Sequence, residues 1–162
     1  MTDPTVRTGT PEDVDGVMRL AAQATEENGF VEPNMIKLLG EVWAALSRDH
    51  GIMGVIGPVG GNLEAAVLLR IGPMWYSDQI VLEEKAIFVH PDYRAAKIGR
   101  ARLMCEFSKK VADTLNVPLM IGVLSNTRTA AKVKLYTRQF GEPAGAYFLY
   151  NARTGSLPET PA

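Results

Sequence analysis

The sequence has few of the residues and segments that mark secreted or membrane-bound proteins. Its 162 residues include one cysteine, Cys105, so no disulfide can form within the chain, and this fits a reducing compartment. No apolar run approaches the length of a membrane span, and the first thirty residues are acidic rather than signal-like. We therefore expect a cytoplasmic protein without a membrane partner.

The chain does have enough apolar residues for one core. Hydrophobic residues make up 46% of it and charged residues 22%, as in ordinary globular domains. At this length the simplest organisation is a single domain over residues 1–151, followed by a flexible tail over residues 152–162. The sequence shows neither an internal repeat nor a second domain.

The net charge of −1 hides an uneven distribution along the chain. Residues 1–50 carry nine acids against four Lys/Arg, whereas residues 91–140 carry ten Lys/Arg against three acids. These charges can simply cover solvated faces. The alternative is that the basic region binds an anionic cofactor and the acidic region receives a cationic or amine partner.

Hydrophobic periodicity predicts a mixture of strands and helices. We expect strands at residues 5–8, 51–56, 63–71, 80–89, 119–124 and 146–151. We expect helices at about residues 10–27, 33–46, 100–115 and 126–140. Elements in this order predict a mixed sheet with helices on its faces, an α/β domain of the α+β type. Trp43 falls on the apolar stripe of the second helix, and we expect it in the core.

Residues 87–103 join a strand to a helix through a short basic turn. A β-branched apolar run stops at Pro91, and an amphipathic helix follows after the turn. The first N–H groups of a helix have no partner within it and carry the positive end of its dipole, so they bind anions. Arg94, Lys97 and Arg100 add positive charge. This arrangement predicts a site for a phosphorylated ligand.

Glu83 and Glu84 stand in the middle of the otherwise apolar strand 80–89. One solvent-facing side of the strand would account for one carboxylate, and a β-bulge could expose both. A partly buried carboxylate has a raised pKa, which suits a general base. From the residues alone, both the structural and the catalytic interpretation stay open.

This order of elements, together with residues 89–101, resembles the GCN5-related N-acetyltransferases. The acetyl-CoA loop of that family reads Gln/Arg-x-x-Gly-x-Gly/Ala after Val-x-Pro and an aromatic residue. Val89-His90-Pro91-Asp92-Tyr93-Arg94 matches the approach, and Gly99 and Ala101 match the end. The resemblance covers roughly Thr5 to Asn151. It implies a mixed, mostly antiparallel sheet of six to seven strands flanked by about four helices.

The resemblance also implies acetyl-CoA as co-substrate, and no metal. Lys97 and Ala95 stand where the family has glycines; a lysine can replace close backbone approach with charge, so binding should survive. We further expect a bulge to free backbone N–H groups near Phe88 and Val89, which would polarise the thioester carbonyl. The residues that the resemblance assigns to the cofactor are Ile87, Phe88, Val89, Arg94, Ala95, Ala96, Lys97, Ile98, Gly99, Arg100, Ala101 and Asn126.

The implied chemistry is direct transfer of an acetyl group to a primary amine in a ternary complex. Glu83 falls where histone-acetyltransferase-like members carry their catalytic glutamate, and Glu84 is the alternative base. The base would remove a proton from the ammonium, whose pKa is about 10. Tyr136, in a Leu-Tyr pair, corresponds to the tyrosine that protonates the departing thiolate.

The acceptor should lie against the acidic first half of the chain and the loop after the third strand. The residues expected to contact it are Glu26, Glu27, Phe30, Trp75 and Tyr76. The sequence does not identify the amine, and a homodimer is left open. A non-catalytic acyl-CoA sensor is the alternative function. A nucleic-acid partner is not expected, because the cations of residues 128–138 form no single stripe.

Overall fold

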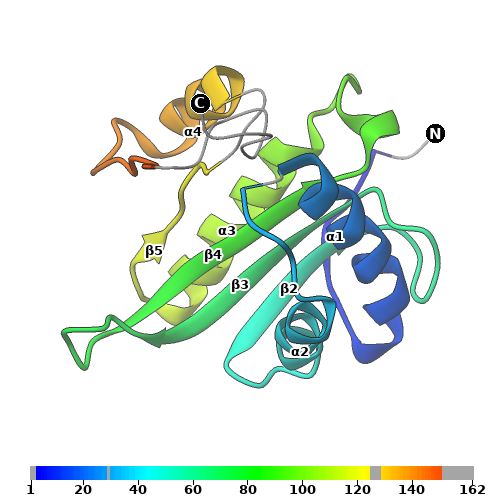
Figure 1. Cartoon of the computed structure of the whole chain (residues 1–162), viewed down its shortest axis with the longest axis horizontal. Helices are drawn as coiled ribbons and strands as arrows, with labels where there is room; N and C mark the ends of the chain where they lie inside the picture. The colour runs from blue at the N-terminus through cyan, green and yellow to red at the C-terminus, as the bar shows by residue number, and fades with distance from the viewer. Residues whose placement is uncertain (1–2, 29, 125–128, 151–162) are drawn as a thin grey trace.

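Five strands form one mixed sheet in the order β1-β2-β3-β4-β5 (Figure 1). The computed structural model describes residues 3–28, 30–124 and 129–150, so the expected tail and Asn126 lie outside the described residues. The first three pairings are antiparallel, and β4 and β5 are parallel. The strands are β1 (Arg7–Thr8), β2 (Gly51–Ile56), β3 (Ala65–Pro73), β4 (Ile80–Val89) and β5 (Leu119–Met120).

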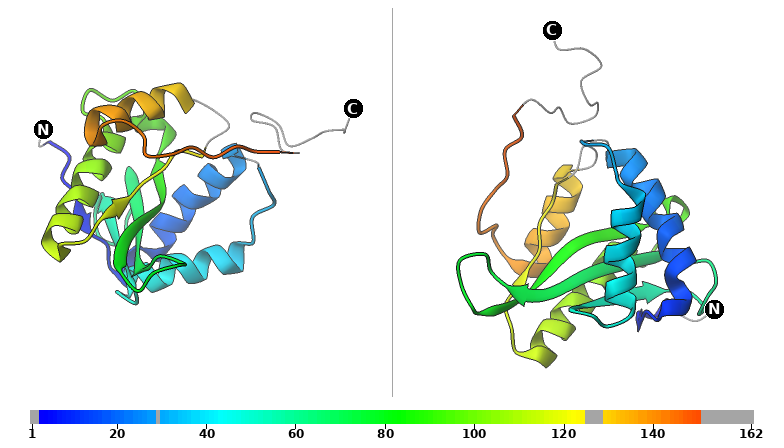
Figure 2. Two further views of the ribbon diagram at one scale, coloured as in Figure 1. Left: turned by 90° about the vertical axis from the view of Figure 1, so that its left-hand side faces the viewer. Right: turned by 60° about the horizontal axis from the view of Figure 1, so that its bottom comes forward.

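Helices cover both faces of this sheet. Figure 2 shows α1 and α2 on one face and α3 and α4 on the other. The α-helices are α1 (Val14–Asn28), α2 (Met35–Leu46), α3 (Arg100–Leu115) and α4 (Thr129–Phe140), with short 3-10 turns η1 (Pro11–Asp13) and η2 (Pro91–Tyr93). In the described part of the chain, no helix is long and apolar enough to cross a membrane.

Several of these boundaries were predicted because local residues set them. Strands β2 and β4 span the expected residues. Asn116 ends α3 in the left-handed conformation, with φ 54°, and Gly141 follows α4 with φ 89°. The predicted fold class is therefore confirmed, although the described sheet has five strands rather than six or seven.

The core has two parts, one on each face of the sheet. On the α1–α2 face, Val17, Leu46 and Met53 belong to one buried cluster. On the α3 face, Leu82 and Met104 belong to the other. Cys105 is completely buried on α3, as its place on the apolar stripe predicts.

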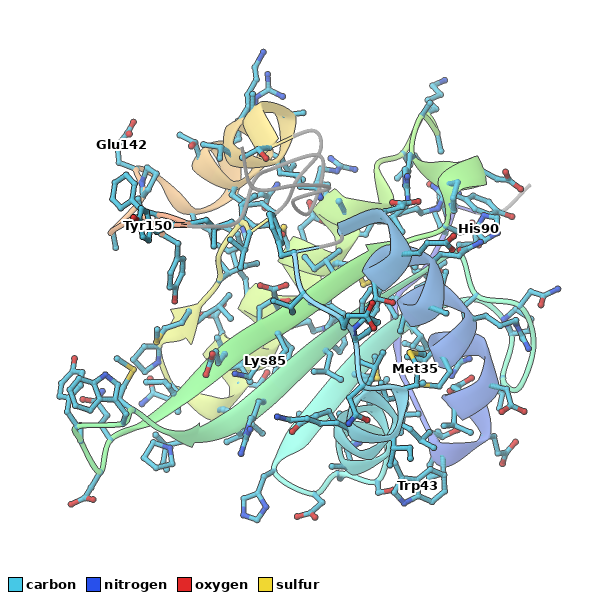
Figure 3. All side chains as sticks on the ribbon, viewed as in Figure 1. Met35, Trp43, Lys85, His90, Glu142 and Tyr150 are labelled. Atoms are coloured by element: carbon cyan, nitrogen blue, oxygen red, sulfur yellow. The ribbon has the colours of Figure 1, made fainter. Side chains whose placement is uncertain are left out.

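Two expectations about apolar residues are wrong. The Trp43 side chain is 49% exposed on the outside of α2 (Figure 3), because this helix buries only Val42, Ala45 and Leu46. Residues 145–150 form no strand, and Tyr150 is 91% exposed. Strand propensity depends on a partner, and the neighbouring edge strand β5 contains only two residues.

Asp13 links the start of α1 to two distant parts of the chain. Its completely buried carboxylate accepts two hydrogen bonds from Arg7, at 2.8 and 2.9 Å. It also accepts the backbone N–H groups of Thr10 and Gly60, at 2.9 and 3.1 Å. The hydrogen bonds from Arg7 are the largest cause lowering the pKa of Asp13 to about 2. This carboxylate therefore stays ionised and holds β1, α1 and the β2–β3 turn together.

Candidate functional site

Strand β4 contains a bulge at Lys85. Leu68 of β3 pairs with Ala86 and Leu69 pairs with Glu84, so Lys85 is the extra residue. Phe88 remains in regular register with β3, as does Val89. The expectation that a bulge frees the N–H groups of these two residues is therefore wrong. The pairing with β3 sets the position of a bulge, and the sequence of β4 alone does not reveal it.

Among the described residues, no strand pairs with the β5-facing edge of β4 beyond Glu83, and we call this part the open edge. The parallel ladder consists of two pairs, Leu82 with Leu119 and Glu83 with Met120. Figure 1 shows the chain after β5 diverging from β4. On the opposite edge of β4, the N–H of His90 donates to the Glu64 carbonyl of the preceding turn at 2.8 Å.

The open edge presents backbone donors. Hydrogen bonding alternates along an antiparallel strand, so the bond made by His90 toward the β3 side directs the N–H groups of Ile87 and Val89 to the other edge. Regular alternation thus supplies N–H groups that the sequence analysis attributed to a bulge.

The N-terminus of α3 lies beyond the loop that follows β4. Gly99 is the N-cap residue and provides no side-chain cap; the first bond into the helix runs from the N–H of Leu103 to the Gly99 carbonyl at 3.2 Å. Within the described residues, the N–H groups of residues 97–102 have no acceptor. The helix therefore presents unpaired donors at its positive end.

Packing within the chain does not require a glycine at position 99, the N-cap of α3. Its φ of −63° suits any residue. A Cβ placed there would have the Cβ of Arg102 as its nearest neighbour, at 3.7 Å. The fold has room for a side chain at Gly99, so the missing side chain fits the close approach of a ligand to the backbone.

Two of the three cations expected to bind a phosphate have acidic partners. Arg94 donates to Glu27 at 2.7 Å, and Arg100 donates to Glu64 at 2.9 Å. Arg100 also lies 5.2 Å from the centre of the Tyr93 ring. Lys97 is exposed and has no ion-pair partner in the described chain. The lysine that departs from the family's glycine pattern is thus the available cation of the loop.

The two adjacent glutamates lie on opposite faces of the sheet. Glu84 lies two residues after Leu82, which is part of the core against α3, so Glu84 faces α3 as well. Glu83 faces the α1–α2 side, where its carboxylate accepts a hydrogen bond from Lys85 at 2.8 Å. Figure 3 labels Lys85 on the part of β4 that α1 and α2 leave uncovered.

Glu84 occupies the place where β4 and the chain after β5 separate. The backbone N–H of Gly122, on the chain after β5, acts on its carboxylate. Burial is the largest effect on Glu84 and raises its pKa to about 7, with the charge of Glu83 acting in the same direction. The Gly122 N–H and the cations of Lys85 and Lys132 oppose this shift.

The charge of Glu84 acts on Cys105 of α3 and on Tyr136 of α4. Burial raises the pKa of the Tyr136 hydroxyl well above its usual 10, and the Glu84 charge adds to this shift. Burial raises the pKa of the Cys105 thiol to about 12, again with a contribution from Glu84. The Tyr136 ring packs edge to face with Phe140, with centroids 5.9 Å apart. The charge of Glu84 thus acts on Tyr136, a residue of a different segment that was also predicted as catalytic.

The residues expected to bind the acceptor are not all brought together. A cavity of about 390 Å³ lies between the end of α1 and the start of α2, and Glu26 lines it. Glu27 points to Arg94 instead, and Phe30 lies in the adjoining loop. The lining, which includes the previously unconsidered Glu32, consists of Ala22, Thr25, Glu26, Val31, Glu32, Pro33 and Met35.

Trp75 and Tyr76 lie elsewhere, on the turn between β3 and β4. Their side chains are 93% and 68% exposed, and their rings pack against each other with centroids 5.2 Å apart. Figure 1 shows this turn at the end of β4 opposite to η2. These two aromatic residues therefore do not line the cavity beside α1.

No model of a known protein family matches the sequence, and no functionally curated protein matches it either. Solved structures match nearly the whole chain. A possible acetyltransferase from Clostridium difficile 630 is 18% identical with a TM-score of 0.67, covering 91% of this chain and 96% of its own. An aminoglycoside N-acetyltransferase, AAC(6')-Iy, in complex with CoA is 14% identical with a TM-score of 0.67, covering 93% and 95%.

A third structure extends the likeness to another kind of acetyltransferase. The ribosomal-protein-alanine N-acetyltransferase from Brucella melitensis is 18% identical with a TM-score of 0.62, covering 94% of this chain and 100% of its own. Likeness at such low identity establishes the fold. This chain has the fold of the GCN5-related N-acetyltransferases, as the resemblance of its sequence implied.

Proposed function

We propose that this protein is an N-acetyltransferase that moves an acetyl group from acetyl-CoA to a primary amine. The observation that carries the proposal is the open edge of β4 in the same domain as the unpaired N–H groups of residues 97–102. The open edge offers N–H donors to the extended arm that carries the acyl group. Residues 97–102 offer N–H donors to phosphates. A structural neighbour bound to CoA supports this ligand.

The phosphates of CoA would bind at the start of α3. Lys97 supplies the available cation there, and Gly99 lets the ligand approach the backbone. The N–H groups of Ile87 and Val89 would polarise the thioester carbonyl, since a fixed donor stabilises the negative charge that develops on that oxygen. The remaining loop residues would contribute backbone rather than charge.

The chemistry would use one acid and one base. Glu83, on the side of the acceptor cavity, would take a proton from the ammonium through water, and the neutral nitrogen would attack the thioester carbon. The C–N bond forms, the C–S bond breaks, the acetylated nitrogen loses its second proton to solvent, and Tyr136 gives a proton to the sulfur. Because acid or base catalysis contributes roughly 10²–10⁴-fold, losing either group should slow turnover without abolishing it.

The cavity beside α1 suits an acceptor that is both cationic and partly apolar. Glu26 and Glu32 provide negative charge, while Ala22, Val31 and Met35 provide apolar surface. A charged amine could leave its ammonium near the carboxylates and its hydrocarbon part against the apolar side chains. The acidic first part of the chain would attract such a molecule over a longer range.

Release of CoA tests the proposal. Wild-type protein is incubated with acetyl-CoA and a panel of amines: polyamines, aminoglycosides, amino acids and peptide N-termini. We expect turnover on at least one, and Tyr136→Phe should lower kcat about 100-fold or more. Tyr147→Phe is the matched control, because that side chain is 80% exposed.

Binding of CoA, measured by calorimetry, separates this function from its alternative. Tight binding by the wild type without turnover on any amine would contradict catalysis and favour the acyl-CoA sensor. Absence of CoA binding would contradict both functions.

A further inference from the structure

The side chain of Arg94 folds back onto the strand that its loop has just left. Pro91 and the 3-10 turn η2 reverse the chain directly after β4, and the N–H of Arg94 donates to the Pro91 carbonyl at 3.3 Å. The Nε of Arg94 donates to the carbonyl of Val89, also at 3.3 Å. A turn that begins with a proline holds the backbone, and the strand holds the side chain, so this guanidinium has a defined position.

The hydrogen bond between Arg94 and Val89 lies on the open edge of β4. A residue of an antiparallel strand directs its N–H and its C=O to the same edge, and the Val89 N–H points away from β3. The Val89 carbonyl therefore lies on the open edge too, where Arg94 satisfies it. The Val89 N–H beside it is a donor that would polarise the thioester carbonyl. Arg94 thus lies next to the reacting part of the proposed site.

The same guanidinium reaches the last turn of α1. Its Nη2 donates to both carboxylate oxygens of Glu27, at 2.8 and 2.7 Å, across 67 residues of the chain. The Arg94 side chain is 29% exposed and that of Glu27 is 39% exposed, so solvent reaches only part of this ion pair. One side chain therefore joins the end of β4 to the end of α1.

The end of α1 has charges that a helix by itself disfavours. Glu26 and Glu27 stand at the negative end of the helix dipole, and the last turn contains no basic residue. Arg94 compensates Glu27, whereas Glu26 has no ion-pair partner in the described chain and lines the acceptor cavity. Residues that break a local rule are expected where a function requires them. The ion pair of Glu27 holds in place the turn that presents Glu26 to the cavity.

We propose that Arg94 is a positioning residue that fixes the acceptor cavity relative to the acyl-binding edge of β4. The inference rests on the proposed acetyl transfer. Arg94 acts through Glu27 on the acceptor side and through Val89 on the acyl side. The phosphates are left to Lys97 and to the N–H groups of residues 97–102. Fixed placement of the amine raises the rate, because a displacement of about 1 Å at the reacting atoms can cost roughly 100-fold.

The test measures kcat, KM for the amine and Kd for CoA in Glu27→Gln and Arg94→Met. Glutamine keeps the shape of Glu27 without its charge, and methionine keeps an apolar stem at position 94 without the donors. We expect each variant to lower kcat about 10-fold at saturating substrates, while the Kd for CoA stays within about 2-fold of the wild type. Lys110→Met, which removes an exposed cation of α3, is the control and should keep the wild-type kcat.

A double variant tests whether the two residues act as a unit. In the Arg94→Met background, Glu27→Gln should have little further effect on kcat, because the effects of residues that act together are not additive. Unchanged kcat in either single variant would overturn the inference and leave the ion pair a purely stabilising role. A raised KM for the amine with unchanged kcat would also overturn it. A loss of CoA affinity of about 10-fold in Arg94→Met would instead assign Arg94 to the phosphates.

These outcomes are distinct from a failure of the proposed function, in which the wild type itself would acetylate no amine. Should Arg94→Met fail to fold, shown by circular dichroism, Arg94→Lys replaces it. A lysine keeps the positive charge but lacks the planar fork whose separate nitrogens reach Val89 and Glu27, so kcat should still fall. A lysine variant with the wild-type kcat would contradict the positioning role of the guanidinium.

Discussion

Asp13 and Glu84 are both removed from solvent, yet their pKa values shift in opposite directions. Asp13 is completely buried, but Arg7 and two backbone N–H groups hold its pKa at about 2. For Glu84, burial is the largest effect and raises the pKa to about 7, with only the Gly122 N–H and two lysine charges opposing it. Hydrogen bonds donated to the carboxylate outweigh burial at Asp13, whereas burial is the larger effect at Glu84. A carboxylate with several donors stabilises the fold, whereas a carboxylate with a raised pKa is of the kind found at sites of proton transfer.

The largest expected effect is the loss of stability in Asp13→Asn. The variant leaves the Arg7 guanidinium without its anionic partner, and breaking a buried ion pair costs about 3–5 kcal/mol. Urea denaturation measures the free energy of unfolding, with exposed Glu12→Gln as control. A loss below about 1 kcal/mol would contradict the role of Asp13 as a link between distant segments.

The pH dependence of the same pair has a definite sign. The pKa of Asp13 is lower in the fold than its ordinary 3.8, so its contribution is fully present above about pH 4 and is lost as the pH falls toward 2. Asp13→Asn should lack this part of the acid-induced loss. Equal acid sensitivity of variant and wild type would contradict the shift.

Glu84→Gln should change the pH dependence of stability in the direction opposite to that of Asp13→Asn. The pKa of Glu84 rises from 4.5 to about 7 on folding, so stability is fully present below pH 4.5 and is lost as the pH rises through 7. The cost in the wild type above pH 7 is up to about 3 kcal/mol. The variant should therefore be the more stable protein at pH 8 and equal to the wild type at pH 4. Unfolding curves at both pH values check this; a wild type more stable at pH 8 would disprove it.

Gly99→Ala sharpens the distinction between residues that serve the fold and residues that serve the ligand. The open space at Gly99 predicts a free energy of unfolding that is unchanged or raised by up to about 1 kcal/mol. The added methyl group should weaken CoA binding roughly 10-fold, or about 1.4 kcal/mol. Calorimetric titration with CoA measures the change. Unaltered affinity would place the phosphates away from this helix end.

The smallest effect is expected from Lys85→Met. Its ion pair with Glu83 is partly exposed, with 37% and 44% of the two side chains accessible, so losing it should cost less than about 1 kcal/mol. Thermal unfolding at low and high salt measures the change, and Arg102→Met, whose contact with Glu106 is longer at 3.9 Å, is the control. A loss above about 2 kcal/mol would show that the Lys85–Glu83 ion pair stabilises the fold as the buried ion pair of Asp13 does, and not as an exposed pair.

Local residues were sufficient to predict much of this fold. The run of apolar residues in β4, Pro91 and the amphipathic pattern of α3 identify a strand, a turn and a helix N-terminus without knowledge of any distant contact. The breaks at Asn116 and Gly141 could be predicted for the same reason, because a left-handed backbone conformation is a property of single residues. The expected anion site and the candidate residues Glu83 and Glu84 follow from such local patterns, whereas Tyr136 was assigned through the family resemblance.

Other features depend on which segments meet in space. The bulge at Lys85 results from the register with β3. It lies before Phe88 and Val89, where the sequence led us to expect a bulge. The ion pair between Arg94 and Glu27 joins residues 67 apart and leaves Lys97 as the available cation. The division of Glu83 from Glu84 requires knowing which face of β4 packs on α3. Composition and periodicity determine elements, whereas burial and charge pairing depend on neighbours distant in the chain, so only the folded structure shows that Glu84, and not Glu83, faces α3.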